Sequence, residues 1–369
     1  ETVSVRGRGL VFDPRNLDGF ELTSGGGQHG MSMDDWGRKF VCQNSVPAQT
    51  LMYDDRYAAR NPQLKAVAPA VSIAPDGKYT KLYRVSPPEP WRVLRTRLRK
   101  EGKFRGSDEG GKPFGFFTGA TGITIFRGDA WPRKYHGNMI VGDVANNLVY
   151  RADLEQQGLG LVARRADAKA EFLASTDIWF RPVQFANAPD GNLYMLDMCR
   201  ELIEGAAFLP PEFFKYLDAA SGNDRGRIYR IVSRESHRKD DTPVRLGELS
   251  SSDLVPLVAH PNGWHRDVAS RLLYQRQDRR VVPALEKLAV EATLPQGRMT
   301  ALHVLEGMNS LRGEMVLKGL ADASAQVRIQ ALRLAERHVA GSPAIRAALV
   351  AMHTDDDLGI LYQLAFSLG

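Results

Sequence analysis

A change of hydrophobic period near residue 240 limits what this chain can fold into more than any other feature. Before it, apolar and polar residues alternate in short runs that are separated by turns such as Pro189-Asp190-Gly191. After it, alanine and leucine recur at helical spacing. Short alternating runs predict strands, and a period of about 3.6 residues predicts helices. We therefore predict a multi-domain β and α protein, with a β domain at residues 1–234, a polar linker at 235–247 and a helical domain at 248–369.

The β domain repeats one local unit, in which an apolar run, a tight turn and a second apolar run follow one another. The unit occurs at residues 30–42, 121–143 and 183–197, and further strands are expected at 9–13 with 20–23, 71–73 with 81–85, 148–153 and 225–232. Asp-Gly turns between alternating runs are strong hairpin signals. Small antiparallel sheets at this interval are typical of a β-propeller. About four blades can be counted, so we predict a partial β-propeller with its remaining blades upstream.

The helical domain repeats with a period near thirty residues. Arg266, Arg298 and Arg328 each stand three residues before an alanine, and leucines follow each of them. Other helices are expected at residues 281–289, 314–320 and 358–368. Paired helices at this interval are typical of an α-solenoid of HEAT-like repeats. We predict such an array, with alanines where two helices approach closely and leucines in the seam.

Composition and charge exclude several classes of protein. The sequence has no run of about 20 apolar residues, so it holds no membrane-spanning helix. Its two cysteines, Cys42 and Cys199, are too few for a disulfide framework or a tetrahedral zinc site, and no Cys-x-x-Cys-His occurs for haem attachment. A formal net charge of +6 over 369 residues lacks the clustered basic patch of a nucleic-acid-binding protein.

The densest basic run lies at residues 91–105. Arg95, Arg97 and Arg99 alternate there with other residues, which is the period of a strand with one solvated face. We therefore predict a solvated strand, and the alternative is a site for an anionic ligand or partner.

Functional groups of propellers gather on the loops that lead into the innermost strand of each blade. Three such lead-in segments occur here, at residues 24–30, 117–122 and 177–182. A histidine and an arginine that meet at one channel mouth, as we expect for His29 and Arg181, could deprotonate a hydroxyl group and hold an anionic cofactor. The alternatives are structural, because His29 could bond a loop carbonyl, Arg181 could form a salt bridge, and the glycines at 25–27 could form a tight turn.

Asp143 and Asp197 end the second strands of their hairpins at matching places. This repeated placement favours a structural hydrogen bond, with calcium ligation as the alternative. Asp34 and Asp35 look like a carboxylate pair, but they occupy a hairpin turn, and we predict a turn role for them.

Several longer motifs resemble one known family. They lie at residues 25–38 (GGGQHGMSMDDWGR), 54–62, 89–93 (EPWRV), 172–177, 179–185, 221–231, 260–264 and 271–278. Over nearly its whole length, the sequence is similar to the PVC-type haem-binding CxxCH proteins, also described as membrane-bound dehydrogenases. The resemblance implies a periplasmic or secreted protein with a propeller, HEAT repeats and a terminal cytochrome c module. The propeller is similar to soluble glucose and sorbosone dehydrogenases, which implies pyrroloquinoline quinone and calcium as cofactors.

The sequence departs from that family at three places. The cytochrome module is absent from it, so haem c would belong to a further segment. Cys199 stands where the family usually has a tyrosine before its Arg-Glu pair, and Gly205-Ala206 replaces the usual His-Pro. The resemblance does not name a substrate beyond a sugar or an alcohol.

We therefore expect an exported oxidoreductase that oxidises a sugar or an alcohol with a quinone and passes electrons to a cytochrome c. His29 would be the general base, and Arg181 would steady the developing alkoxide. The expected cofactor-binding residues are Gln28, Thr121, Trp179, Arg200 and Glu201, and the expected metal ligands are Asp143 and Asp197. The alternative is a non-catalytic protein whose propeller binds a glycan or a peptide and whose helical repeats dock a protein partner. The first hypothesis requires His29 and Arg181 to share a pocket.

Overall fold

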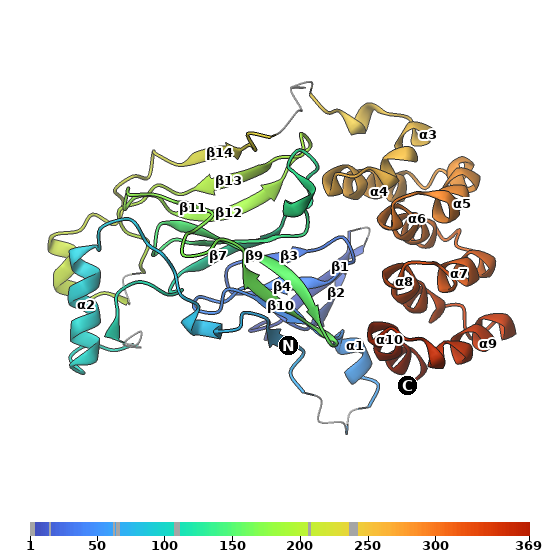
Figure 1. The fold of residues 1–369 in the computed structure, drawn as a ribbon, viewed down its shortest axis with the longest axis horizontal. Helices are drawn as coiled ribbons and strands as arrows, with labels where there is room; N and C mark the ends of the chain where they lie inside the picture. Colours follow the sequence, from blue (N-terminus) through green and yellow to red (C-terminus); the bar gives the residue numbers. More distant parts are fainter. Residues whose placement is uncertain are drawn as a thin grey trace. The chain divides into compact units, whose positions relative to one another are not determined.

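The computed structural model describes residues 4–14, 16–61, 63, 67–106, 111–205, 208–235 and 243–369 (Figure 1). The chain divides into two compact units. The first comprises residues 1–126, 137–186 and 193–231, and the second comprises 127–136, 187–192 and 232–369. Strands fill the first unit and helices fill most of the second, which confirms the predicted combination of β and α parts. Residues 236–242 of the predicted linker lie outside the described residues.

The strands of the first unit form antiparallel sheets, as the hairpin pattern predicts. One sheet has the order β3 (Met31–Met33), β4 (Lys39–Val41), β5 (Gln49–Leu51) and β6 (Ala70–Ser72). The next has the order β10 (Gly160–Arg165), β9 (Leu148–Gln157), β8 (Met139–Asp143) and β7 (Ala120–Ile125), and β11 (Leu173–Ala174) pairs with β9. A third runs β12 (Pro182–Asn187), β13 (Leu193–Asp197) and β14 (Arg227–Ile231), and β1 (Gly9–Asp13) pairs with β2 (Asn16–Thr23). None of these described sheets closes on itself.

Two strand predictions need correction. Residues 81–85 do not pair with 71–73, because β6 pairs with β5 and Lys81 makes only an isolated bridge to Phe116. The basic run at 91–105 is not a strand, because residues Pro90–Lys100 form the helix α2. Proline at the first helical position favours a helix start. The buried residues Trp91, Arg92, Arg95 and Thr96 recur at the spacing of one helical face.

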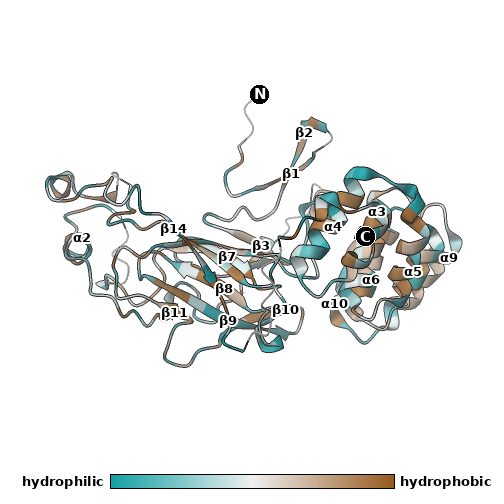
Figure 2. Ribbon diagram, turned by 90° about the horizontal axis from the view of Figure 1, so that it is seen from above, coloured by the Kyte–Doolittle hydropathy of each residue, from teal (hydrophilic) through white to brown (hydrophobic). Residues whose placement is uncertain are grey.

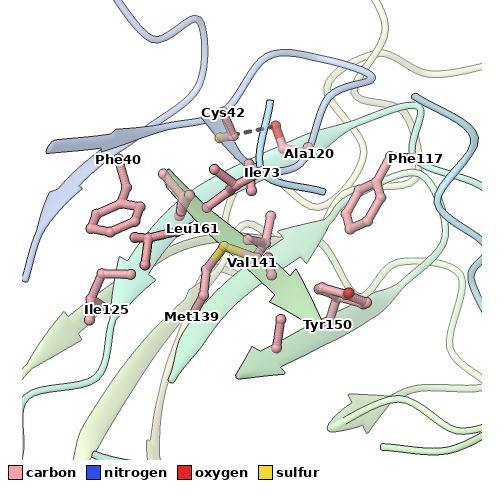
Figure 3. Packing of buried hydrophobic residues seen from close by; sticks show 14 of the residues in the cluster. Phe40, Cys42, Ile73, Phe117, Ala120, Ile125, Met139, Val141, Tyr150 and Leu161 are labelled. Atoms are coloured by element: carbon pink, nitrogen blue, oxygen red, sulfur yellow. Dashed lines mark hydrogen bonds between the residues drawn. The ribbon is translucent and has the colours of Figure 1, made fainter. Parts of the chain in front are cut away.

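The main core of the first unit lies between its sheets (Figure 3). Phe40, Ile125, Met139 and Val141 have no exposed surface, and Phe117 meets Tyr150 edge to face. Burying each such side chain stabilises the fold by about 1.5–3 kcal/mol. A smaller core joins α2 to the segment that follows β13, through Trp91, Leu202, Leu209 and Phe213.

The helices of the second unit lie in two rows. One row holds α4 (Gly263–Arg276), α6 (Pro295–Gly307), α8 (Ala325–Ala335) and α10 (Leu358–Leu368). The other holds α5 (Val282–Glu291), α7 (Gly313–Leu320) and α9 (Pro343–Ala351). Contacts within each row and between the rows bury the alanines and leucines of the predicted repeats. Figure 2 shows hydrophobic and hydrophilic residues side by side along these helices, as expected of amphipathic helices.

Shorter helices complete both units. They are α1 (Asp55–Ala58) and α3 (Ser251–Leu254), with the 3₁₀ turns η1 (Gly77–Tyr79), η3 (Arg133–Tyr135), η5 (Pro211–Lys215), η6 (Leu246–Glu248), η7 (Pro256–Ala259), η8 (Arg279–Val281) and η9 (Met352–Thr354). No helix in the described ranges is both long and apolar enough to cross a membrane.

The recurring arginines of the helical repeats share one structural role. Nη1 of Arg266, Arg298 and Arg328 donates to the backbone carbonyl six residues earlier, at 2.6, 2.7 and 2.9 Å. Arg298 also pairs with Asp322, and Arg328 pairs with Asp355, so these two arginines hold both the turn before their own helix and the turn of the following repeat. This explains why the repeat places an arginine in the first helical turn.

Candidate functional site

The backbones of the three predicted lead-in segments lie next to one another. The Gly122 N–H donates to the His29 carbonyl at 2.9 Å, and Thr121 Oγ1 donates to the Pro182 carbonyl at 2.7 Å. Gly122 has φ +60°, and a Cβ there would lie 2.8 Å from the Gln184 Cα. The starts of β3, β7 and β12 are therefore packed so closely that only glycine fits at this position.

His29 is exposed on its lead-in segment. Partial burial lowers the pKa of His29 below 6.5, so its imidazole is neutral at pH 7 and able to accept a proton. The neighbouring Gln28 is also exposed, and its Oε1 accepts a hydrogen bond from the Asn44 N–H at 3.1 Å. A Cβ at Gly26 or Gly27 would lie within 3 Å of the backbone oxygen of Arg8 or Gly30, so the glycine run allows close approach of the backbone.

The Arg181 side chain is fully buried and does not lie beside His29 in a pocket of the described residues. Within the described part of the chain, four hydrogen bonds hold its guanidinium. Nη1 donates to Glu89 Oε1 at 3.2 Å and to the Val144 carbonyl at 2.7 Å, Nη2 donates to the Glu201 carbonyl at 2.6 Å, and Nε donates to the Arg200 carbonyl at 2.9 Å. Arg181 thus forms a buried salt bridge, the structural alternative that the sequence left open.

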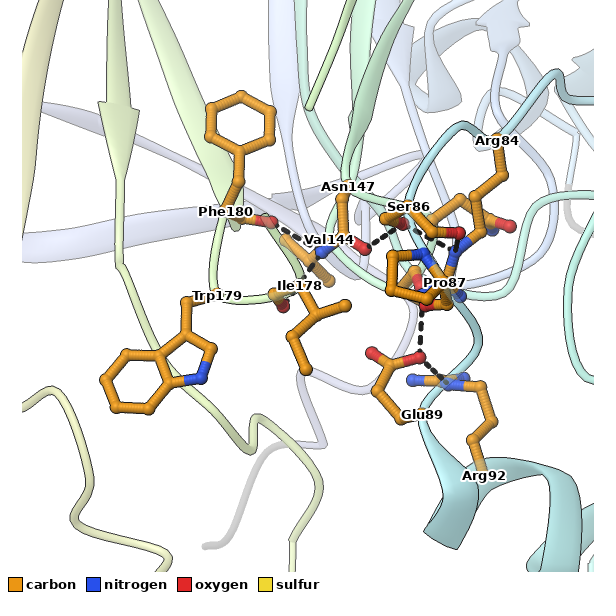
Figure 4. A network of polar contacts seen from close by, with 12 residues as sticks. Arg84, Ser86, Pro87, Glu89, Arg92, Val144, Asn147, Ile178, Trp179 and Phe180 are labelled. Carbon is orange, nitrogen blue, oxygen red and sulfur yellow. Dashed lines mark hydrogen bonds and ion pairs between the residues drawn. The ribbon is translucent and has the colours of Figure 1, made fainter. Parts of the chain in front are cut away.

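Glu89 is the anion at the centre of this network (Figure 4). Its Oε2 lies 2.8 Å from Arg84 Nη2 and 3.7 Å from Arg92 Nε, and all these side chains are almost completely buried. Burial alone would raise the pKa of Glu89, but Arg92, Arg84 and Arg181 together hold it below its ordinary value of 4.5. The carboxylate is therefore ionised, and it offsets part of the charge of three buried arginines.

Next to this network lies a pocket of about 370 Å³, here named the α2 pocket. Its walls are mostly apolar and aromatic, with two acidic residues among them: Glu89, Pro90, Trp91, Leu94, Ile178, Glu201, Phe213, Tyr216 and Leu217. Arg181 holds two of these wall residues, Glu89 through its carboxylate and Glu201 through its carbonyl. In the described residues, the Glu201 carboxylate itself makes no hydrogen bond or ion pair.

Sequence reasoning assigned Glu201 to a cofactor site, but it missed the aromatic walls of the pocket. Phe213 lies in η5, which begins at Pro211 directly after Pro210, and Tyr216 follows its last residue. Tyr216 is 86% exposed, although aromatic side chains are usually buried. An exposed aromatic ring after a double proline is the signal that could have pointed to this wall.

The remaining predicted cofactor residues form two groups. Thr121 and Gln28 belong to the lead-in segments described above. Trp179 and Arg200 lie beside the Arg181 network, since the Arg200 N–H donates to the Trp179 carbonyl at 3.1 Å. Arg200 Nη1 donates to the Ala220 carbonyl, and the Arg225 guanidinium lies 5.7 Å from the centre of the Trp179 ring.

Asp143 and Asp197 accept hydrogen bonds from backbone N–H groups at matching places in their sheets. Asp143 is fully buried, and its two oxygens accept hydrogen bonds from the N–H groups of Thr118, Gly119, Ala145 and Asn146. Asp197 Oδ1 accepts from the N–H groups of Arg181 and Cys199. The two aspartates thus tie the end of one strand to the start of its sheet, and no group of three or more His, Cys, Asp or Glu among the described residues could hold a metal ion.

A family model matches the β-rich part of the chain. No curated protein matches the chain. The family model that matches residues 1–235 is described as "Domain of unknown function (DUF7133)". It covers the whole β-rich part, including the Arg181 network and the α2 pocket. The chain therefore belongs to the DUF7133 family.

Proposed function

We propose that the chain is a binding protein that holds a sugar, or a similar uncharged polyol, in the α2 pocket. The observation that carries this proposal is the placement of a half-buried carboxylate, Glu201, in a wall otherwise lined by Trp91, Phe213 and Tyr216. A sugar ring has apolar C–H faces that pack on aromatic rings, and its hydroxyl groups donate to carboxylate oxygens. A pocket with apolar walls and few polar groups is the usual form of a small-molecule site.

The charges around the pocket favour an uncharged ligand. A cation is disfavoured because the Trp91 ring already carries the guanidinium groups of Arg92 and Arg95, with Cζ at 4.9 and 5.2 Å from its centre. An anion is disfavoured because Glu201 would repel it. A volume of about 370 Å³ lies within the ordinary range for small-molecule pockets and suits a mono- or disaccharide.

The finer architecture is part of the same proposal. We interpret the sheets that begin with β3, β7 and β12 as consecutive blades of a β-propeller. Support comes from their antiparallel order and from the hydrogen bonds that link the starts of their first strands. We interpret the two rows of helices as HEAT-like repeats, which the recurring arginine contacts support, and we propose a protein partner for them.

The proposal is tested by calorimetric titration of the chain with a panel of neutral mono- and disaccharides. We expect saturable binding by at least one sugar, weakened about tenfold by Glu201→Gln and by Tyr216→Ala, since a lost charged hydrogen bond or ring contact is worth about 1–2 kcal/mol. Matched controls are Glu212→Gln and Tyr79→Ala, which change exposed residues outside the pocket and should leave the affinity unchanged. Equal loss of affinity in test and control variants, or no saturable binding by any sugar of the panel, would overturn the proposal.

A quinone-dependent oxidoreductase is the second candidate, and the exposed position of His29 on its lead-in segment favours it. Of the two residues expected to be catalytic, His29 is exposed and Arg181 is enclosed. Dye reduction with added quinone and calcium over the same sugar panel separates the candidates. Reduction that is abolished by His29→Gln supports the enzyme, and binding without reduction supports the binding protein.

A further inference from the structure

We infer that Arg181 is the positioning residue of the α2 pocket, which fixes the backbone of Glu201 so that its carboxylate stands in the wall. The role of Glu201 in binding rests on the proposed function, but the hold of Arg181 on the backbone of Glu201 can be measured without a ligand. The Arg181 side chain is fully buried, so a ligand in the pocket cannot touch it. Its influence on the pocket must therefore pass through the groups that it holds.

The contacts of Arg181 converge on the chain at 199–201. Nε donates to the Arg200 carbonyl and Nη2 to the Glu201 carbonyl, at 2.9 and 2.6 Å. Two successive carbonyls thus point at one guanidinium, which sets the direction of the peptide on both sides of Glu201. The opposite edge of the guanidinium is held by Glu89 and Val144, so the arginine itself has little freedom.

The backbone at residues 199–201 is strained at Cys199, and the Arg181 hydrogen bonds stabilise it. Cys199 has φ +51°, in the left-handed region that costs a residue with a side chain about 1–2 kcal/mol. Its N–H donates to Asp197 Oδ1 at 2.9 Å, and the Arg200 N–H donates to the Trp179 carbonyl at 3.1 Å. Without the two Arg181 bonds, the carbonyls at 200 and 201 lose buried partners and the strained turn can relax.

Lysine cannot replace arginine here. The guanidinium reaches four acceptors in fixed directions, whereas an ammonium group is a single point of donation. Arg181→Lys therefore keeps the buried charge beside Glu89 but loses the paired contact with the two carbonyls. Arg84→Lys is the matched control, because Arg84 is also buried and pairs with Glu89, while its other bonds go to Ser86, Pro87 and Ala145.

The ligand-free test is hydrogen exchange of the backbone amides at 200–202 in the full chain. We expect at least tenfold faster exchange in Arg181→Lys than in wild type, and no change in Arg84→Lys. Near-ultraviolet circular dichroism checks that both variants are folded. An unchanged exchange rate in a folded Arg181→Lys variant, or equal acceleration in both variants, would overturn the inference. If Arg181→Lys fails to fold, the same comparison is made with Arg181→Gln.

The ligand-dependent test is a double-mutant cycle on the affinity for the best sugar of the panel. Arg181→Lys and Glu201→Gln should each weaken binding about tenfold, and the double variant should be no weaker than Arg181→Lys alone, because both remove the same interaction. Arg181→Lys and Tyr216→Ala should be additive. Additivity of the first pair would overturn the positioning role. Absence of any sugar binding would refute the proposed function instead, and the exchange result would then decide the inference.

Discussion

Glu89 and Arg181 form an ion pair in which neither side chain is more than 1% exposed, with 3.2 Å between Oε1 and Nη1. Glu89 opens α2, and Arg181 stands directly before β12, so the pair joins two segments that lie 92 residues apart. The Glu89 carboxylate also forms ion pairs with Arg84 and Arg92. The first unit therefore carries a buried polar centre beside its mostly apolar pocket, and Glu89 belongs to both.

Glu89→Gln is expected to destabilise the chain by about 3–5 kcal/mol, because it leaves buried guanidinium groups without their anion. The change in the free energy of unfolding is measured by urea denaturation, which is followed by a spectroscopic signal from the first unit. Glu101→Gln is the control, since Glu101 lies at the end of the same helix in a surface pair with Lys103. A cost below 1 kcal/mol for Glu89→Gln would contradict the assignment of Glu89 as the central anion.

The pH dependence of stability follows from the lowered pKa of Glu89. A carboxyl group with a lower pKa in the folded state adds stability that is present above the unfolded-state pKa, near 4.5, and is lost as pH falls through the folded-state value. Wild type should therefore lose more unfolding free energy than Glu89→Gln between pH 5 and acid pH. Parallel curves would show that Glu89 is not held ionised.

Gly122→Ala tests the close packing of β7 against β12. A Cβ at Gly122 would meet the Gln184 Cα at 2.8 Å and the Val183 carbonyl at 2.9 Å, whereas a Cβ at Gly158 meets nothing within 4 Å. Both glycines have similar φ, +60° and +57°. Gly158→Ala should therefore lower the free energy of unfolding by about 1 kcal/mol, for the left-handed backbone alone. Gly122→Ala should lower it by about 3 kcal/mol, because the new Cβ also clashes. Equal costs in thermal denaturation would argue against the packed lead-in segments.

Asp322→Ala tests the arginine contacts of the helical repeats. Asp322 bonds Arg298 through both oxygens, at 2.6 and 2.8 Å, and caps the turn before α8 through the Ser324 N–H. We expect a loss of about 2–3 kcal/mol, while the exposed Asp356→Ala should cost less than 0.5 kcal/mol. Burial would raise the pKa of Asp322, but Arg298 and the Ser324 N–H hold it below 3.8, so its contribution should fade only below about pH 4.

His29→Gln separates the lead-in segments from the α2 pocket. His29 does not line the pocket, so the variant should bind the best sugar with unchanged affinity. The imidazole proton signals of His29 should titrate with a midpoint below 6.5, because partial burial lowers its pKa. A tenfold loss of sugar affinity in His29→Gln would instead place the ligand beside the lead-in segments.

The hairpins could be predicted from the sequence because their signals are local. At residues 30–42 the turn aspartate Asp34 accepts hydrogen bonds from the Trp36 and Arg38 N–H groups, as its position in the turn predicts. The helices around Arg266, Arg298 and Arg328 were also predictable, since leucine and alanine mark the buried face directly.

The helix α2 was missed because its buried face is charged. A search for hydrophobic period reads Arg92 and Arg95 as solvent-facing, but both are 1% exposed and pair with Glu204. Their shared partner Glu204 lies more than 100 residues further along the chain than Arg92. Only the folded chain brings them together, so the alternation of Arg95, Arg97 and Arg99 suggested a strand.

The α2 pocket could not be predicted for a related reason. Its walls come from three segments, at 89–94, 178 and 201–217, none of which is recognisable alone as a binding motif. Arg181 was predicted to be catalytic, but its side chain is fully buried and its guanidinium bonds Glu89 and the backbone carbonyls of the wall segment. The direction in which a side chain points depends on packing between distant segments, and local sequence patterns do not predict it.

The central claim is the location of a neutral sugar in the α2 pocket, and fluorine NMR of the chain labelled with 5-fluorotryptophan tests it most directly. The chain has five tryptophans, and Trp91 lines the pocket, whereas Trp36, Trp131 and Trp264 do not. Titration with the best sugar should shift the Trp91 signal, assigned by Trp91→Phe, and leave those three signals in place. A saturable shift of Trp36, Trp131 or Trp264 with the Trp91 signal unmoved would contradict the account.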